Sequence, residues 1–205
     1  MAEDPRFRNR TPDAGSVSSY LREYLSGLQE ALGRLPDEHV ERAFGLLRAA
    51  SERGSRVFVA GNGGSAAIAD HLCCDWMKGT QVEHRPALQV VSFTANTPLL
   101  TALANDFGYD EGFARQVEMQ GAEGDLLVLI SSSGNSPNVL RAAEAARRKK
   151  MGVIGMTGFG GGKLAEIADV SLHVPVQNYG IAEDGHQMLM HVFAQFLARL
   201  RDQEA

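Results

Sequence analysis

Apolar residues follow two periodicities along this chain, and the change between them divides it into structural elements. Over 16–36, apolar residues recur every three or four positions, as in an amphipathic helix, and a second helical pattern covers 37–54. After Gly54, short β-branched runs alternate with further helical stretches. The pattern therefore predicts a helical hairpin followed by an alternation of strands and helices.

The runs with the composition of buried strands cover 56–61, 86–93, 125–131, 151–158 and 168–176. The helical stretches after the hairpin cover 65–78, 97–120, 136–150, 162–168 and 180–203. Strands that alternate with helices pair in parallel through right-handed crossovers, and continuous apolar strands imply a sheet covered on both faces. We therefore predict an α/β fold, a three-layer α/β/α sandwich with a central parallel sheet of about five strands.

Length and composition indicate one globular domain. The chain has 205 residues, of which 44% are hydrophobic and 22% charged, so it can bury a sizeable core. The two cysteines, Cys73 and Cys74, are adjacent and rarely bridge in such a position. We predict a flexible tail over 1–15 and a single domain over 16–205.

Net charge and hydropathy limit the classes of binding partner that we expect. The formal charge is -5, and without a dense basic patch we expect no nucleic-acid partner. No apolar run approaches the ~20 residues of a membrane span, so we expect no membrane partner. The N-terminal segment lacks the apolar core of a signal peptide, which favours a cytoplasmic protein.

Two loops at predicted strand ends carry the donors of an anion site. In "GNGGSA", after 56–61, glycines let the backbone approach a ligand, and Ser65 is the expected N-cap of the next helix. In "SSSGNSPN", residues 131–138, Ser136 is the expected N-cap and Pro137 the first helical residue. Ligands of open parallel sheets bind beyond the carboxyl ends of the strands, where both loops fall. Taken singly, either loop is also explained by a helix cap and a tight turn.

A dinucleotide site is the rival interpretation of the first loop. Gly61, Gly63 and Ala66 fit the fingerprint G-x-G-x-x-G/A. That site needs an acidic residue at the end of the next strand, where the chain has "TANT", and it leaves the serine loop unexplained. Hydroxyls and amides without a lysine suit a sugar monophosphate better.

Two helices carry polar lines that suit a metal ion. His71 and Asp75 are four residues apart, and Glu183, Gln187 and His191 repeat at the same spacing. If the two lines converge, they form a nitrogen and oxygen site suited to zinc or another divalent ion. A hydrogen-bonded core histidine and a glutamate that favours a helix N-terminus are the alternatives, and spacing alone leaves them open.

The stretches "GNGGSA", "ANDFGY" and "ISSSGNSPNV" resemble the sugar-isomerase (SIS) domain family and, within it, the phosphoheptose isomerases. The similarity runs from about residue 20 to about residue 200. It implies a flavodoxin-like SIS fold and a homotetramer with sites near the subunit interfaces. It also implies conversion of sedoheptulose 7-phosphate to D-glycero-D-manno-heptose 7-phosphate through a metal-assisted enediol.

The resemblance also implies roles for individual residues. It places the metal ion on His71, Asp75, Glu183 and His191, with Asp75 as the base and His191 as the acid. Asp75 stands where the family usually has glutamate, and Glu183 where it has glutamine. The residues expected to bind substrate are Asn62, Gly63, Ser65, Asp106, Ser131, Ser132, Ser133 and Ser136.

Two other functions fit the same sequence. One is a non-catalytic SIS module that binds a sugar phosphate or a protein partner. The other is an isomerase for a different sugar phosphate, such as a pentose 5-phosphate. Relatives of the first kind lose the acidic residue after the histidine, whereas this chain keeps both Asp75 and His191.

Overall fold

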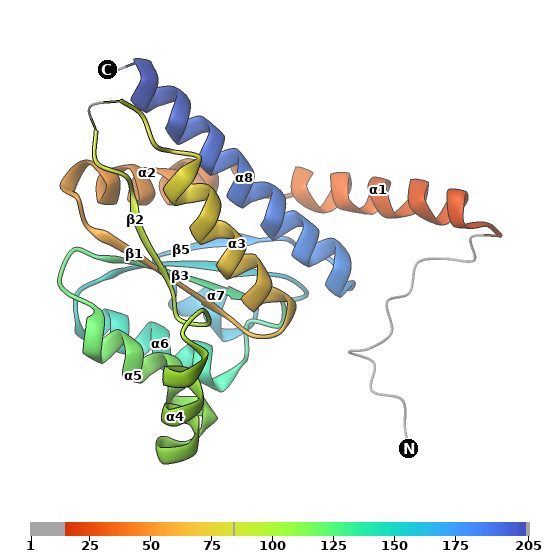
Figure 1. The fold of residues 1–205 in the computed structure, drawn as a ribbon. Helices are drawn as coiled ribbons and strands as arrows, with labels where there is room; N and C mark the ends of the chain where they lie inside the picture. The colour runs from red at the N-terminus through yellow and green to blue at the C-terminus, as the bar shows by residue number, and fades with distance from the viewer. Residues whose placement is uncertain (1–14, 84, 204–205) are drawn as a thin grey trace.

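The computed structural model describes residues 15–83 and 85–203, and it confirms the predicted fold class (Figure 1). Apart from Gly15, the expected tail lies outside the described residues. The parallel strands pair in the order β2-β1-β3-β4-β5. They are β1 (Arg56–Gly61), β2 (Gln89–Ser92), β3 (Leu126–Ser131), β4 (Gly152–Thr157) and β5 (Val170–His173).

Helices precede the sheet and cover both of its faces (Figure 1). The predicted hairpin is α1 (Val17–Gly33) and α2 (Asp37–Arg53). The others are α3 (Gly64–Lys78), α4 (Thr97–Phe107), α5 (Gly112–Gln120), α6 (Pro137–Arg148), α7 (Gly162–Ile167) and α8 (Tyr179–Gln203), with a 3₁₀ turn, η2 (Tyr109–Glu111). None of the helices described is long and apolar enough to cross a bilayer.

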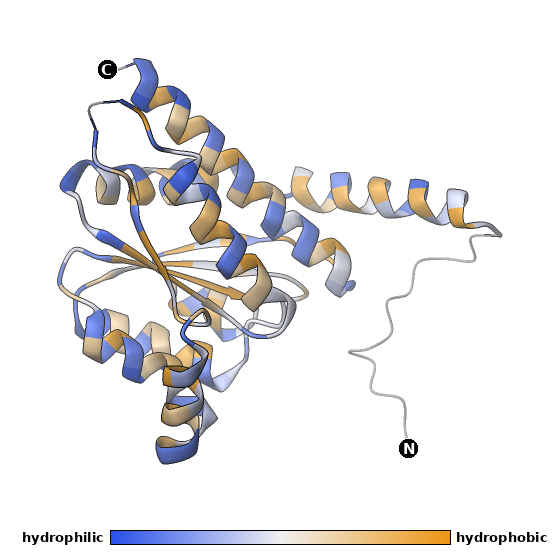
Figure 2. Cartoon of the chain, in the orientation of Figure 1, coloured by the Kyte–Doolittle hydropathy of each residue, from blue (hydrophilic) through white to orange (hydrophobic). Residues whose placement is uncertain are grey.

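Each strand buries side chains on both faces of the sheet. Val57 and Val59 of β1 join a core with α1, α2, α3 and α8. Phe58 and Ala60, which alternate with them, join a second core with α5, α6 and α7. The orange strands at the centre of Figure 2 show this two-sided apolar character. The pattern explains why the central strands β1, β3 and β4 are apolar at nearly every position.

One predicted helix is divided in two. The stretch 97–120 was expected to be helical throughout, but α4 ends before Gly108 and α5 begins at Gly112. Gly108 has a φ of +89°, which a helix cannot contain. The short turn η2 fills the gap and changes the direction of the chain.

The topology brings the two predicted loops together. In the sheet β1 has β2 on one side and β3 on the other, so the strand order reverses direction between β1 and β3. Gly61 at the end of β1 pairs in register with Ile130, which is followed by the last residue of β3. The loops after these two strands therefore leave the same edge of the sheet side by side.

Helices α3 and α8 lie side by side along one face (Figure 1). The indole of Trp76 on α3 is buried and donates its N–H to the backbone carbonyl of Met190 on α8, at 3.0 Å. Leu72 of α3 and Leu189 of α8 belong to the same core. This pairing brings together the two helices that carry the polar lines.

We expect stability to fall in mild acid because of His186 on α8. The side chain is fully buried, and burial lowers its pKa from 6.5 to about 4 because the imidazolium would lose its hydration. Between these values the unfolded chain binds a proton that the folded chain does not. The free energy of unfolding should therefore decrease as the pH falls from 6.5 to about 4, by up to ~1.4 kcal/mol per pH unit.

Urea unfolding at a series of pH values measures this slope. His186→Gln should flatten the slope in this window, since it removes the titrating group. Leu189→Ala, a buried change on the same helix, should lower stability at every pH and keep the slope. Equal slopes for the wild type and His186→Gln would show that another group is responsible.

Candidate active site

The loop after β1 turns directly into α3 through its glycines. A Cβ on Gly61 would lie 2.7 Å from the Cβ of Ser65, so a side chain has no room there. Gly63, with a φ of 57°, is the N-cap, and α3 begins at Gly64. The expectation that Ser65 caps the helix is wrong. Gly63 takes a backbone conformation with positive φ, which glycine allows, and caps the helix two residues earlier, so Ser65 is buried in its first turn.

The loop after β3 has the predicted form. Ser136 is the N-cap of α6 and Pro137 its first residue. Gly134 has a φ of 64°, and a Cβ there would lie 1.9 Å from a backbone oxygen of Gly161. The hydroxyl of Ser131 accepts a bond from the Gly134 N–H at 3.2 Å. The buried hydroxyl of Ser132 has no partner among the described residues. The side chain of Ser136 makes no cap bond, and its hydroxyl lies 3.5 Å from that of Ser131.

These two loops and the start of α8 surround a pocket of about 150 Å³, here called the serine pocket. It is lined by Asn62, Ser65, Ile130, Ser131, Ser132, Ser133, Ser136, Tyr179 and Glu183. Six of the residues expected to bind substrate are among them. None of these described lining residues is a lysine or arginine, so the donors offered to an anion are neutral.

Of the two remaining expected residues, Gly63 adjoins the lining and Asp106 lies apart from it. Asp106 is exposed near the end of α4 and accepts a bond from the side chain of Asn105 at 2.9 Å. The side chain of Asn62 is fixed in place by two reciprocal bonds with Asn138, both 2.9 Å long. The hydroxyl of Tyr109 adds a third bond, to Asn62 Oδ1, at 2.8 Å.

Sequence reasoning missed Tyr179, which lines this pocket, and Asn138, which holds the side chain of Asn62. Asn138 closes the motif "SSSGNSPN", so its place beside the serines could have been noticed. Tyr179 precedes the long polar and apolar pattern of α8 and gave no signal of its own. Only the packing of the start of α8 against the serine loop places its side chain at the pocket.

A second group of polar side chains joins α3 to α8. His71, Asp75 and His191 each offer a ligand atom, and these atoms lie within 4.8 Å of one another. Asp75 Oδ1 is 3.5 Å from His71 Nε2, and Asp75 Oδ2 is 3.2 Å from His191 Nε2. The two polar lines therefore approach each other at these three residues, here called the metal cluster because they could hold an ion.

Gln187 completes the metal cluster. Its Nε2 is 2.6 Å from His71 Nδ1 and 3.4 Å from His191 Nε2. Rotation of the amide by half a turn would place its oxygen at the same point. Ligand atoms ~2.1 Å from a tetrahedral ion lie ~3.4 Å apart, which is close to the separations of Asp75 from the two histidine Nε2 atoms. The shorter contact of Gln187 is to Nδ1 of His71, the nitrogen that does not face Asp75. Two imidazoles and a carboxylate therefore suit a divalent ion, with the Gln187 amide beside them.

Glu183, the expected fourth ligand, lies outside the metal cluster. Its carboxylate packs against the first residue of α3, where a Cβ on Gly64 would be 2.5 Å from Glu183 Oε2. Eight residues separate Glu183 from His191, which is ~12 Å along a helix axis. Glu183 instead lines the serine pocket, and Gln187, one turn closer to His191, contacts both histidines.

One face of α8 links the two sites. Tyr179 and Glu183 line the serine pocket, and Gln187 and His191, at the same spacing of four, belong to the metal cluster. A ligand that spans both sites would hold an anionic end near the loops and place its other end ~12 Å away. The arrangement suits an extended phosphorylated molecule whose reacting atoms are remote from the phosphate.

Comparison with known proteins agrees with this geometry. The SIS domain family matches residues 19–158. A phosphoheptose isomerase from Rhodospirillum rubrum is 48% identical over 136 residues, which are 66% of this chain and 72% of that protein.

Two solved structures of phosphoheptose isomerases share the fold. The one from Neisseria gonorrhoeae has a TM-score of 0.81 and 35% identity, over 88% of this chain and 96% of its own. The one from Francisella tularensis has a TM-score of 0.83 and 30% identity, over 92% of this chain and 100% of its own. The resemblance in the sequence motifs thus extends to the whole domain.

The position of Glu183 leads to a prediction for Glu183→Gln. Burial raises the pKa of Glu183, and the charge of Asp184 raises it further. At a pH above that pKa, the ionised carboxylate repels an anion bound in the serine pocket. The change should strengthen binding of inorganic phosphate on the order of tenfold, which corresponds to ~1.4 kcal/mol of repulsion removed. The gain should be larger at higher pH. Bound zinc, measured by mass spectrometry, should not change.

Isothermal titration calorimetry measures the affinity for inorganic phosphate, and two further variants serve as controls. Glu144→Gln, the same change of charge on the outer face of α6, should leave binding as it is. Ser133→Ala should weaken binding by roughly 1–3 kcal/mol, because it removes a donor to a charged group. Loss of zinc from Glu183→Gln, with no gain in phosphate affinity, would return Glu183 to the metal site.

Proposed function

This chain belongs to the SIS-domain family and to the phosphoheptose isomerases within it, and we propose that it interconverts sedoheptulose 7-phosphate and D-glycero-D-manno-heptose 7-phosphate. It is an aldose–ketose isomerase. The observation that carries the proposal is the joint geometry of α3 and α8. One end of this pair borders a pocket of neutral anion donors, and the other holds two histidines and a carboxylate.

The serine pocket would hold the phosphate of the substrate. The hydroxyls of Ser131, Ser132, Ser133 and Ser136 leave the end of β3, and the backbone at Gly63 and Ser65 forms the start of α3. Hydroxyls, amide N–H groups and two helix N-termini favour a phosphate dianion without a cationic side chain. Asn62 would contact the substrate from its fixed position, and Asp106 would bind sugar hydroxyls from the end of α4.

Proton transfer would take place at the metal cluster. Isomerisation removes a proton from C1 of the ketose and delivers one to C2, through an enediol. Asp75 would accept the proton from carbon, and His191 would donate a proton to the carbonyl oxygen. Asp75 Oδ2 and His191 Nε2 are 3.2 Å apart, so the proposed base and acid lie close enough to act on adjacent atoms of one substrate.

The donor set of the metal cluster suits zinc or another divalent ion. His71, Asp75 and His191 would hold it, with Gln187 in the place where the sequence suggested Glu183. Such an ion, when bound, supplies electrostatic stabilisation for an oxyanion that develops on the substrate.

Asp75→Asn tests the catalytic role directly. The change keeps the shape of the side chain and removes the proton acceptor, so kcat for sedoheptulose 7-phosphate should fall by ~10²–10⁴-fold. Phosphate affinity by calorimetry should persist, because the serine pocket is not altered. Zinc content, measured alongside, separates loss of the base from loss of the metal.

Asp70→Asn is the matched control. Asp70 is exposed on the same helix and accepts a bond from the Thr94 hydroxyl at 2.7 Å, outside the metal cluster. It should keep full turnover. Full turnover in Asp75→Asn as well would exclude Asp75 as the base, and a wild-type protein with no isomerase activity would favour a binding module.

We further propose that the enzyme acts in the cytoplasm as a homotetramer. Helix α1 extends away from the rest of the molecule in Figure 1, and its buried residues are Leu28 and Ala31, near its end. Leu21 and Leu25 on α1 are 56% and 54% exposed, and Val192 and Phe196 on α8 are also exposed. Large exposed apolar faces on soluble proteins mark interaction sites, here with other copies of the chain.

Light scattering at micromolar concentration should give four times the mass of the chain. The double variant Leu21→Glu and Leu25→Glu should lower that mass, because charges would have to be buried in the contact between subunits. Met119→Glu, an equally exposed apolar position on α5, should leave it unchanged. A monomeric wild type would exclude the assembly.

A further inference from the structure

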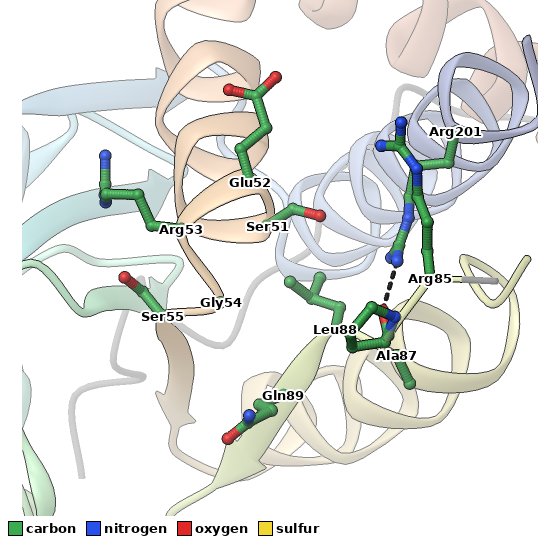
Figure 3. A pocket seen from close by; sticks show the side chains of 11 residues that line it. Ser51, Glu52, Arg53, Gly54, Ser55, Arg85, Ala87, Leu88, Gln89 and Arg201 are labelled. Atoms are coloured by element: carbon green, nitrogen blue, oxygen red, sulfur yellow. Dashed lines mark hydrogen bonds between the residues drawn. The ribbon is translucent and has the colours of Figure 1, made fainter. Parts of the chain in front are cut away.

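A second pocket lies at the opposite edge of the sheet, at the amino ends of β1 and β2 (Figure 3). Its volume is about 340 Å³, and it lies between the end of α2, the segment before β2 and the end of α8. β1 has six residues, which at ~3.3 Å per residue puts this pocket roughly 20 Å from the serine pocket. We call it the arginine pocket, after Arg85 and Arg201 in its lining.

Arg201, near the end of α8, is the main feature of the arginine pocket. Its side chain is only 5% exposed, and its Nη2 donates to the backbone oxygen of Pro86. Its Nε and Nη1 are buried and have no hydrogen-bond partner among the described residues. A buried charged group with unsatisfied donors is costly, and native proteins rarely retain one without a ligand or water.

A second positive charge stands next to it. Burial lowers the pKa of Arg201, and the guanidinium of Arg85 lowers it further. Two guanidinium groups within reach of one another raise the electrostatic potential of the pocket and favour an anion. The pair joins the end of α8 to the segment that follows α3, the same two helices that carry the metal cluster.

The other charged residues of the lining are directed elsewhere. Glu52, the one carboxylate among the described lining residues, accepts a bond from Arg48 Nε at 2.7 Å. Arg53 Nη2 donates to the backbone oxygen of Gly124 at 3.2 Å. In Figure 3 both side chains point away from Arg85 and Arg201, whereas the hydroxyl of Ser51 points toward them.

We propose that the arginine pocket binds a small phosphate-bearing anion, separate from the substrate of the serine pocket. A phosphate would offer several oxygens to the guanidinium groups of Arg201 and Arg85 and to the Ser51 hydroxyl, which line the pocket from different directions. Arginine binds phosphate through paired N–H donors. Ala87 and Leu88 add an apolar wall suited to the organic part of a phosphate ester.

Calorimetry with inorganic pyrophosphate tests the proposal. It uses the full-length double variant Ser133→Ala and Ser136→Ala, in which the serine pocket should bind anions more weakly. Ionic strength is kept constant with chloride. One equivalent of pyrophosphate should still bind, and it should raise the melting temperature. Addition of Arg201→Gln should weaken this binding at least about tenfold, the usual effect of losing hydrogen bonds to a charged group.

Arg147→Gln, the same change of charge at the distant end of α6, is the matched control and should bind as the parent does. Arg85→Gln should weaken binding like Arg201→Gln, and it carries the test if circular dichroism shows that Arg201→Gln does not fold. Three results would overturn the proposal. The first is an equal affinity for pyrophosphate in the parent and in both arginine variants. The second is tighter binding of malonate than of pyrophosphate, and the third is a change in oligomeric mass in Arg201→Gln, which would assign Arg85 and Arg201 to a subunit contact.

Discussion

Burial of both faces of the parallel sheet is the constraint on which the rest of this structure depends. Val57 and Val59 must be covered on one side, and Phe58 and Ala60 on the other, so helices have to cross over both faces. Because the strands are parallel and joined by crossovers, all their carboxyl ends lie at the same edge of the sheet. The two loops with anion donors meet for this reason, because they follow β1 and β3 at the point where the strand order reverses.

The pairing of α3 and α8 turns that edge into a site with two ends. The bond from Trp76 to the Met190 carbonyl and the core around Leu72 and Leu189 fix these helices against each other. Helix α3 starts at the serine pocket and carries His71 one and a half to two turns later. Its pairing with α8 therefore fixes the distance between the serine pocket and the metal cluster. A sugar phosphate whose phosphate lies far from C1 and C2 fits this spacing.

Charge is distributed differently at the two edges of the sheet. At the carboxyl edge, neutral hydroxyls and amides surround a pocket in which Glu183 is the only charged lining residue described. At the amino edge, Arg85 and Arg201 bring positive charge to a pocket of their own. In our proposals a phosphate would be held by neutral donors in the first pocket and by guanidinium groups in the second.

The sequence by itself determined the fold class, because helical and strand periodicities alternate and each element buries the face that its own pattern specifies. It also placed Ser131 to Ser136 at a strand end, and His71 with Asp75 on one helix face, because these depend only on local geometry. Gly108, which divides 97–120 into two helices, shows the limit of periodicity alone.

Only the tertiary structure decided between Glu183 and Gln187. At 3.6 residues per turn, positions four apart rotate by about 40° at each step, so a line of such residues winds around the helix. The packing of α8 on α3 therefore places Gln187 beside His71 and His191 and Glu183 at the serine pocket. Arg85 and Arg201 meet for a similar reason: 116 positions separate them in the sequence (201 − 85), and only the return of α8 to the start of β2 brings them together.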